Sequence, residues 1–135
     1  MGGNGRIKIA VVDDDESVRE SLLGLVESVG YDAAPFRSAE EFLNLKRLDK
    51  FACLILDIRL PGMSGLELYC RLITQHEPVP AVFITAHIDR AMQSRALAQG
   101  ASAFLFKPFP PEALLDAVRT AVAKSKVRPP FEEEA

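Results

Sequence analysis

Residues Phe51–Asp57 have the sequence FACLILD, in which six apolar residues run up to a carboxylate. A run this short and this uniformly apolar is typical of a strand buried on both faces of a sheet. Pro61 and Gly62 follow it and predict a loop. Ser64 and Glu67 then have the spacing of a capping box, which predicts that a helix begins there. This order of strand, loop and helix is typical of a parallel sheet.

The same order recurs on both sides of this stretch. Four more apolar or β-branched runs predict strands at Ile7–Val12, Tyr31–Phe36, Pro80–Ile84 and Ser102–Phe106. Fully apolar strands that alternate with helices predict a parallel sheet covered on both faces. Because the crossovers in such sheets are right-handed, the fold class we expect is a doubly wound α/β sandwich with five strands and five helices.

The helices are predicted from apolar spacing and from capping residues. Capping-box spacing predicts that the first two helices begin near the pairs Ser17 with Glu20 and Ser38 with Glu41. One apolar face of the first helix is predicted from the spacing of Val18, Leu22, Leu25 and Val29. Gly30 and Gly100 predict helix ends, the latter for a helix over Arg90–Gln99. The last helix is expected to open at Pro110–Glu112.

Length and charge limit the classes of protein to which the chain can belong. Its 135 residues and 14.8 kDa fit one domain with a single core. A net charge of −3 and a pI near 5.4 argue against direct nucleic acid binding, which needs a basic surface. The longest uncharged runs, residues 78–88 and 96–106, fall well short of the roughly 20 apolar residues that a membrane span needs.

The N-terminus and the cysteines favour a cytoplasmic protein. Residues 1–5 are too polar and glycine-rich for a signal peptide, and Cys53 and Cys70 lie inside apolar patterns that suit a reducing compartment. We expect residues 6–125 to form the domain and residues 1–5 to be flexible. Residues 126–135, rich in proline and glutamate, are expected to be a flexible tail or the start of a linker.

Polar side chains follow four of the five predicted strands. The first strand ends at Asp13 and Asp14, the third at Asp57, the fourth at Thr85 and the fifth at Lys107. Each has an ordinary structural explanation, such as a helix N-terminus for the acids or a strand end for the lysine. However, ligands bind at the carboxyl ends of parallel strands, so the whole set predicts one site.

The chemistry of that set is specific. Three carboxylates held close together repel one another, and a hard divalent cation such as Mg²⁺ relieves the repulsion. A carboxylate in such a site can still attack phosphorus and form an aspartyl phosphate. Lys107 can supply positive charge to the transferring phosphoryl group, and Thr85 can supply a hydroxyl. The set therefore predicts Mg²⁺-assisted phosphoryl transfer to a carboxylate.

Four motifs carry a resemblance to a known family. They are Val11-Val12-Asp13-Asp14-Asp15, Leu56-Asp57 with Leu60-Pro61-Gly62-Met63-Ser64-Gly65, Ile84-Thr85-Ala86, and Phe104-Leu105-Phe106-Lys107-Pro108-Phe109. In order and spacing, from about Arg6 to about Lys124, the chain resembles the receiver domain of two-component response regulators. It is most similar to receivers that precede a LuxR-type helix-turn-helix output domain. The resemblance implies a flavodoxin-like, CheY-like fold with strand order 2-1-3-4-5.

The resemblance implies roles for the site residues. Asp57 would be the phosphorylation site, which accepts the phosphoryl group from a sensor histidine kinase. Asp14, Asp57 and the backbone carbonyl of Arg59 would bind Mg²⁺ (or Mn²⁺) directly, and Asp13 would act through a bound water. Lys107 would pair with the phosphoryl group.

A switch is implied as well. Thr85 would move to hydrogen-bond the phosphoryl group, and Phe104 would turn inward when it does. The Lys107–Pro108 peptide bond is expected to be cis. Three further positions, at which the family varies phosphoryl access and the rate of dephosphorylation, are Arg59, Ala86 and His87.

The function implied is signalling rather than enzymatic turnover, with self-catalysed phosphoryl transfer and autodephosphorylation. Phosphorylation would change the surface formed by the fourth helix, fifth strand and fifth helix, and with it partner binding or homodimer formation. The chain would regulate transcription through a tethered output domain or a partner protein, either as a free-standing receiver or as the input domain of a longer regulator. No membrane contact is expected.

Two alternatives stay open at this point. Asp13, Asp15, Thr85 and Lys107 follow the order found in phosphatases of the haloacid-dehalogenase type, but little sequence follows Lys107 to supply the later acids of such enzymes. A receiver-like scaffold that is never phosphorylated is the second alternative, and the complete acidic set argues against it. Structural roles are expected for Cys53, Cys70, Met63 and His76.

Overall fold

The computed structural model describes residues 6–45, 50–75 and 79–125 of the chain. Within these residues, five parallel strands form one sheet in the order β2-β1-β3-β4-β5, and five helices connect and follow them, as predicted. The strands are β1 (Lys8–Val12), β2 (Asp32–Phe36), β3 (Phe51–Asp57), β4 (Ala81–Thr85) and β5 (Ala103–Phe106). The helices are α1 (Glu16–Glu27), α2 (Ala39–Leu43), α3 (Gly65–Thr74), α4 (Arg90–Ala98) and α5 (Pro111–Lys124).

Some predictions concern residues outside this part of the chain. They are the flexible N-terminus at 1–5, the tail or linker at 126–135, and the structural role of His76. Within the described ranges, every helix is too short or too polar to cross a bilayer.

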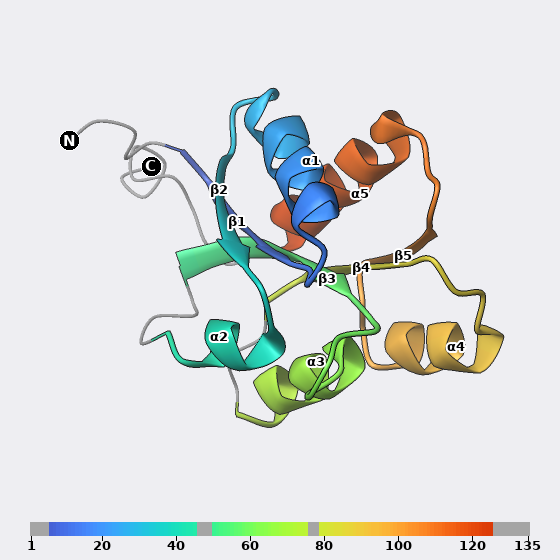
Figure 1. Cartoon of the computed structure of the whole chain (residues 1–135). Helices are drawn as coiled ribbons and strands as arrows, with labels where there is room; N and C mark the ends of the chain where they lie inside the picture. Colours follow the sequence, from blue (N-terminus) through green and yellow to red (C-terminus); the bar gives the residue numbers. More distant parts are fainter. Residues whose placement is uncertain (1–5, 46–49, 76–78, 126–135) are drawn as a thin grey trace.

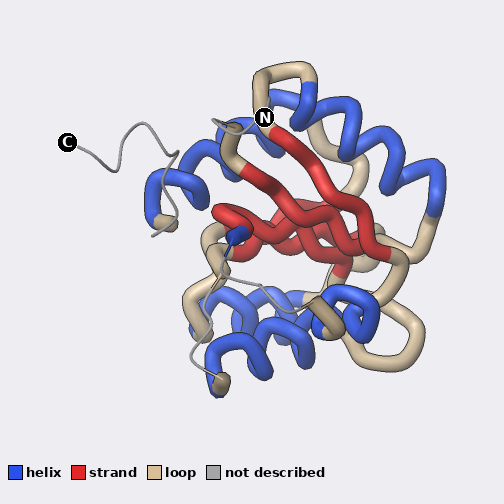
Figure 2. Tube along the Cα trace, turned by 90° about the vertical axis from the view of Figure 1, so that its left-hand side faces the viewer, coloured by secondary structure: helices blue, strands red, loops and turns tan. Residues whose placement is uncertain are grey.

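Helices cover both faces of the sheet (Figure 1). α1 and α5 lie on one face, and α2, α3 and α4 lie on the other. A view at right angles shows the strands between the two helical layers (Figure 2). All seven residues of β3 are buried, because Cys53 and Ile55 pack towards α1 and α5 while Leu54 and Leu56 pack towards α3. This explains why β3 lacks the polar–apolar alternation of a half-exposed strand.

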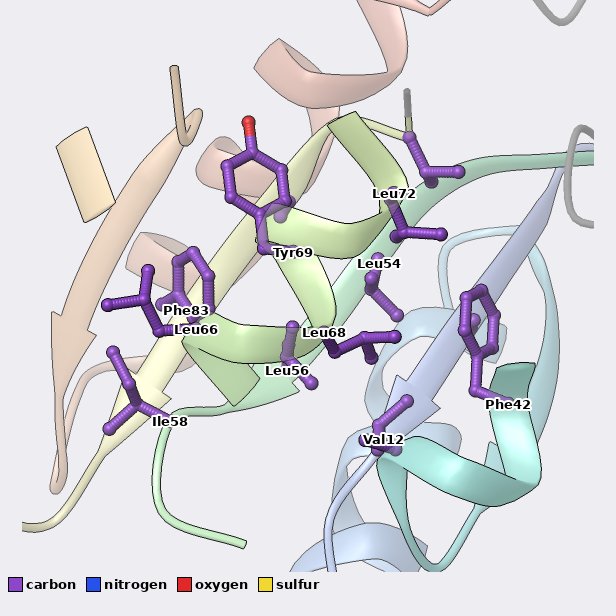
Figure 3. Close-up of a cluster of buried hydrophobic side chains, with 14 of the residues drawn as sticks. Val12, Phe42, Leu54, Leu56, Ile58, Leu66, Leu68, Tyr69, Leu72 and Phe83 are labelled. Carbon is purple, nitrogen blue, oxygen red and sulfur yellow. The ribbon is translucent and has the colours of Figure 1, made fainter. Parts of the chain in front are cut away.

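The layer under α2 and α3 is the more aromatic of the two. Figure 3 shows Leu68 and Leu72 of α3 pointing towards Leu54 and Leu56 of β3, with Phe42 of α2 beside them. Phe42 also belongs to a three-ring cluster, in which its ring centroid lies 5.2 Å from that of Phe36 and 5.7 Å from that of Phe51. Edge and tilted ring contacts of this kind add to the stability gained from burial alone.

Two of the three predicted capping pairs hold the helix starts. Ser64 and Glu67 form the full capping box at α3, with the bonds from Glu67 N–H to Ser64 Oγ and from Ser64 N–H to Glu67 Oε1. Ser38 caps α2 by accepting the Glu41 amide at 3.0 Å. The Glu41 carboxylate, however, accepts the amide of Arg37 at 2.7 Å instead of that of Ser38.

The prediction for the start and face of α1 was wrong in two respects. Asp15, not Ser17, is the N-cap, and it accepts the Val18 amide at 3.1 Å, so the helix begins nearer to Asp13. The helix ends at Glu27, which leaves Val29 in the following turn and 42% exposed. Its buried positions are Arg19, Leu22 and Val26. The three consecutive aspartates hid the cap, because any of them is a good N-cap residue.

The free edge of β2 offers few hydrogen-bond donors. The Asp32 amide bonds to β1 through Ile7, and the Phe36 carbonyl bonds to the amide of Asp13, so the residues between them alternate between β1 and the free edge. Pro35 falls on the free-edge side and has no N–H to donate. The next outward amide, that of Arg37, is taken by Glu41.

The start of α3 packs directly against the end of β3. The Gly65 amide donates to the Ile58 carbonyl at 3.1 Å. A Cβ atom at Gly65 would overlap the Asp57 carbonyl oxygen and lie 3.0 Å from Ile58 Cα. These are backbone atoms, so they cannot yield without moving the residue that carries the Asp57 carboxylate. The close approach therefore requires glycine at position 65.

We expect Gly65→Ala to lower the free energy of unfolding by about 2 kcal/mol, because it forces an extra methyl group into filled space. The matched control is Gly24→Ala within α1, where a Cβ meets nothing within 4 Å. This control should gain about 0.5–1 kcal/mol from the higher helix propensity of alanine. Urea unfolding of both variants and the wild type measures the difference. A Gly65→Ala variant as stable as wild type would contradict the close approach.

Candidate functional site

The carboxyl ends of the strands bring the predicted site residues to one edge of the sheet. Asp57 is the last residue of β3 and Thr85 is the last residue of β4. Asp13 comes directly after β1, and Lys107 comes directly after β5. Because β3 lies between β1 and β4, the Asp57 side chain leaves the middle of this edge.

Three carboxylates form a cluster there. One oxygen from each of Asp13, Asp14 and Asp57 lies within 4.8 Å of the other two. Asp13 is fully buried and Asp57 is 9% exposed, whereas Asp14 is exposed to solvent. Carboxylate oxygens are the ligands that hard cations such as Mg²⁺ prefer, with water completing the shell. The donor set, with one member open to solvent, fits a divalent cation.

Each buried carboxylate is held through one oxygen by a backbone amide. The Asp15 amide donates to Oδ1 of Asp13 and the Arg59 amide donates to Oδ1 of Asp57, each at 2.9 Å. The Nζ atom of Lys107 lies 3.4 Å from Oδ2 of Asp13 and 3.5 Å from Oδ2 of Asp57. One ammonium group therefore bridges two carboxylates and offsets part of their repulsion.

Asp57 is harder to ionise than an ordinary aspartate. Burial raises the pKa of its carboxyl group, and the negative charge of Asp13 raises it further. The hydrogen bond from the Arg59 amide and the positive charge of Lys107 lower the pKa but do not cancel the effect of burial. Without a cation, the ionised form of Asp57 is therefore held at a cost in stability.

Thr85 lies at the same edge, and both its carbonyl and its hydroxyl oxygen accept hydrogen bonds from backbone amides. Its carbonyl accepts the Lys107 amide at 2.7 Å, and its hydroxyl oxygen accepts the His87 amide at 3.1 Å. Thr85 itself is buried, whereas Ala86, His87 and Arg59 are exposed. The hydroxyl hydrogen of Thr85 is not used in that bond, so it can be donated to a ligand oxygen.

Phe104 belongs to the core. It is 9% exposed, and its ring centroid lies 6.0 Å from that of Phe83 and 5.4 Å from that of Phe106. It packs in the layer shared with α3 rather than among the charges of the acidic cluster. The Lys107–Pro108 peptide bond is cis, as predicted.

The cysteines and Met63 have the structural roles expected. Cys53 is fully buried, and burial raises the pKa of its thiol to about 12. Cys70 is half-buried, and its Sγ donates to Gln99 Oε1 at 2.8 Å. Met63 packs against the core and donates its amide to Oε2 of Glu40 at 2.9 Å, which anchors the loop after β3.

Sequence reasoning missed two residues that support the site. Glu40 anchors the loop after β3 through Met63, and no pattern connects two positions 23 residues apart. Arg19 is buried on α1 and donates from Nη1 to the Asp13 carbonyl at 2.7 Å. A signal for Arg19 was present, because it lies three and seven residues before Leu22 and Val26 and so places a charge on the apolar face.

Comparison with known proteins decides the family. The family model described as "Response regulator receiver domain" matches residues 9–119. The chain belongs to the response regulator receiver family. This confirms the resemblance drawn from the four motifs, and it decides against the haloacid-dehalogenase alternative.

Relatives of this receiver domain are regulators of greater length. Nodulation protein W of Bradyrhizobium diazoefficiens is 44% identical over 89% of this chain and 53% of its own length. Response regulator protein TmoT of Ectopseudomonas mendocina is 43% identical over 94% of this chain and 56% of its own. The chain thus spans about half the length of the curated relatives it matches.

Solved structures agree with the fold of this receiver domain. Response regulator StyR has 45% identity and a TM-score of 0.82, with 89% of this chain and 61% of that one covered. The non-phosphorylated HemR receiver domain of Leptospira biflexa has 27% identity and a TM-score of 0.80, with coverage of 90% and 98%. Receiver domains generally act in signalling and bind Mg²⁺ at an acidic cluster, and here Asp13, Asp14 and Asp57 lie together.

In the absence of divalent cations, we expect Asp57→Asn to raise the free energy of unfolding at pH 7 by up to about 1 kcal/mol. The pKa of Asp57 is raised in the folded state. The wild type therefore loses stability as the pH rises above about 4, the usual pKa of an aspartate. The Asp57→Asn variant has no carboxyl group to ionise at this position and does not lose that stability. Lys107 keeps its partner Asp13 in the variant.

The measurement is urea unfolding at pH 4 and pH 7 in a chelating buffer. The gain should be largest at pH 7 and shrink towards pH 4. Asp116→Asn, at an exposed position on α5, makes the same change in net charge and serves as the control. An Asp57→Asn variant that is less stable than wild type at pH 7 would contradict the cost assigned to the ionised carboxylate.

Proposed function

We propose that this receiver domain accepts a phosphoryl group on Asp57 from a sensor histidine kinase and passes its phosphorylation state to an output domain or partner protein that regulates transcription. The observation that carries the proposal is the position of the Asp57 carboxylate, at the end of the central strand and between an acidic cluster and Lys107. A phosphoryl acceptor needs a nucleophile of this kind with positive charge beside it.

Asp13, Asp14 and Asp57, with the backbone carbonyl of Arg59, would hold Mg²⁺ (or Mn²⁺). When bound, the cation supplies positive charge to the phosphoryl oxygens and relieves the repulsion between the carboxylates. Within the protein, the Arg59 amide occupies Oδ1 of Asp57, so Oδ2, which lies 3.5 Å from Lys107 Nζ, would be the oxygen that attacks phosphorus. The P–N bond to the kinase imidazole breaks as the new O–P bond forms.

Lys107 and Thr85 would then hold the product. The Lys107 ammonium, already within 3.5 Å of Asp57, pairs with a phosphoryl oxygen, and the buried Thr85 hydroxyl donates to another. Arg59, Ala86 and His87 are exposed at this edge, where they would set access for the water that removes the phosphoryl group.

The switch surface would be α4, β5 and α5. Phe104 of β5 sits in the core between Phe83 and Phe106, so a shift of Thr85 at the end of β4 would reach it through packed rings. Ala96 is the single buried residue of α4, so this helix is held by less apolar contact than α3. Moving a two-state equilibrium from 1:99 to 99:1 needs about 5.5 kcal/mol, which a doubly charged group can supply.

The partners follow from this role. The relatives include proteins named as transcriptional regulators, such as FixJ of Bradyrhizobium diazoefficiens, which this chain matches over 58% of its length. We take residues 6–125 as the receiver domain and residues 126–135 as a tail or the start of a linker. We further propose that the protein is cytoplasmic. Phosphorylation would favour its homodimer.

The test is incubation of the purified chain with acetyl phosphate and Mg²⁺, followed by intact-mass measurement and peptide mapping. We expect one acid-labile phosphoryl adduct, located on Asp57 and absent when Mg²⁺ is chelated. Asp57→Asn should remove the adduct, whereas the exposed control Asp116→Asn should keep it. An absence of adduct in the folded wild type would support a receiver-like scaffold that is never phosphorylated, and would overturn the proposal.

A further inference from the structure

Arg19 is an unusual residue for the interior of this domain. It is 9% exposed and lies on the buried face of α1 with Leu22 and Val26. A buried guanidinium group is costly unless it is hydrogen-bonded. Its Nη1 atom donates to the Asp13 carbonyl oxygen at 2.7 Å. The side chain also lines a polar hollow of about 400 Å³ between α1 and the segment from Pro35 to Glu41.

The bond to Arg19 is the last of four that fix Asp13. The Asp13 amide donates to the Phe36 carbonyl at 3.1 Å. Its Oδ1 atom accepts the Asp15 amide at 2.9 Å, and its Oδ2 atom lies 3.4 Å from Lys107 Nζ. Arg19 occupies the remaining polar group, the carbonyl. The backbone and side chain of Asp13 are therefore both held.

The carbonyl that Arg19 binds belongs to the peptide unit that leads into Asp14. Because a peptide unit is planar, holding its C=O also fixes the direction of the Asp14 N–H and the place of the Asp14 Cα. Among the described residues, no hydrogen bond or ion pair holds the exposed Asp14 carboxylate. Its position near Asp13 and Asp57 thus depends on the backbone that carries it.

We propose that Arg19 is a positioning residue of the acidic cluster. Its bond to the Asp13 carbonyl holds the Asp13–Asp14 peptide so that the Asp14 carboxylate faces Asp13 and Asp57, and it thereby sets the affinity of the cluster for a divalent cation. The inference rests on the proposed function of the cluster as the Mg²⁺ site, and it adds a residue that makes no contact with the cation.

Three possible roles for Arg19 predict different changes in Mg²⁺ affinity when its side chain is replaced. If Arg19 acted only as a nearby positive charge, it would repel Mg²⁺, and its removal would tighten binding. If it served only to pack α1, its removal would lower stability and leave the affinity unchanged. As a positioning residue, its removal weakens Mg²⁺ binding although a repelling charge has been lost.

The experiment is calorimetric titration of the full chain with Mg²⁺, for the wild type, Arg19→Met and Arg19→Lys. The methionine variant keeps most of the apolar stem and loses the donor. It should bind Mg²⁺ about tenfold more weakly, the size typical of a lost outer-shell contact. The lysine variant keeps a charged donor with a different reach and should lose less affinity. Arg119→Met, on the exposed side of α5, makes the same charge change and should bind like the wild type.

Two further readouts separate positioning from simple loss of stability. In the acetyl phosphate reaction, the Mg²⁺ concentration for half-maximal labelling should rise by the same factor in Arg19→Met, with a nearly unchanged rate at saturating Mg²⁺. Hydrogen exchange at the Asp14 and Asp15 amides should be faster in Arg19→Met than in Arg119→Met.

Equal or tighter Mg²⁺ binding by Arg19→Met would overturn the inference. If Arg19→Met does not fold, Arg19→Lys decides the question: weaker Mg²⁺ binding together with faster exchange at Asp14 supports the inference, and wild-type affinity despite faster exchange at Asp14 overturns it. A wild type that binds no Mg²⁺ and takes no label would instead contradict the proposed function, so the two failures are distinguishable.

Discussion

Asp13 and Asp57 carry like charges that the sheet forces together, because β1 and β3 are parallel neighbours that end at the same level. Val12 is paired with Leu56, so the next residue of each strand enters the same small volume. Neither carboxylate can move away. Asp57 ends a strand whose seven residues are buried, and Asp13 has all its polar groups engaged. The burial of apolar side chains on both faces of the sheet stabilises the fold and offsets the cost of this repulsion.

The same arrangement links stability to chemistry. Lys107 directly follows β5, and its long side chain reaches both carboxylates at the carboxyl edge of the sheet. Three carboxylates beside one ammonium group have too little positive charge, so the cluster gains from binding a cation, which also prepares it to accept an anionic phosphoryl group beside Lys107. The site is therefore a locally unfavourable region supported by a favourable core, which is common where proteins bind or react.

Much of the fold could be predicted from the sequence, and the reasons are local. β3 was predicted to within one residue, because a strand buried on both faces is a continuous apolar run whose ends are easily recognised. The Ser64–Glu67 box marked the start of α3 because both partners lie within one turn. The start of α1 was wrong because three adjacent aspartates compete for one cap. The order of the strands came from family resemblance, since periodicity gives no information about neighbours in a sheet. Arg19 was missed because its partner is a backbone carbonyl, which no side-chain pattern records.

The edge of β2 has a consequence for how this domain can associate. Pro35 presents no N–H outward, and Glu41 has already taken the amide of Arg37. An incoming strand would find no regular ladder of donors on that side, which disfavours extension of the sheet by a second chain there. This favours contacts through side chains of helices and loops at this end of the domain, and a change of charge can alter the affinity of such contacts. Strand pairing, in contrast, is made by backbone hydrogen bonds and is less sensitive to a change of charge.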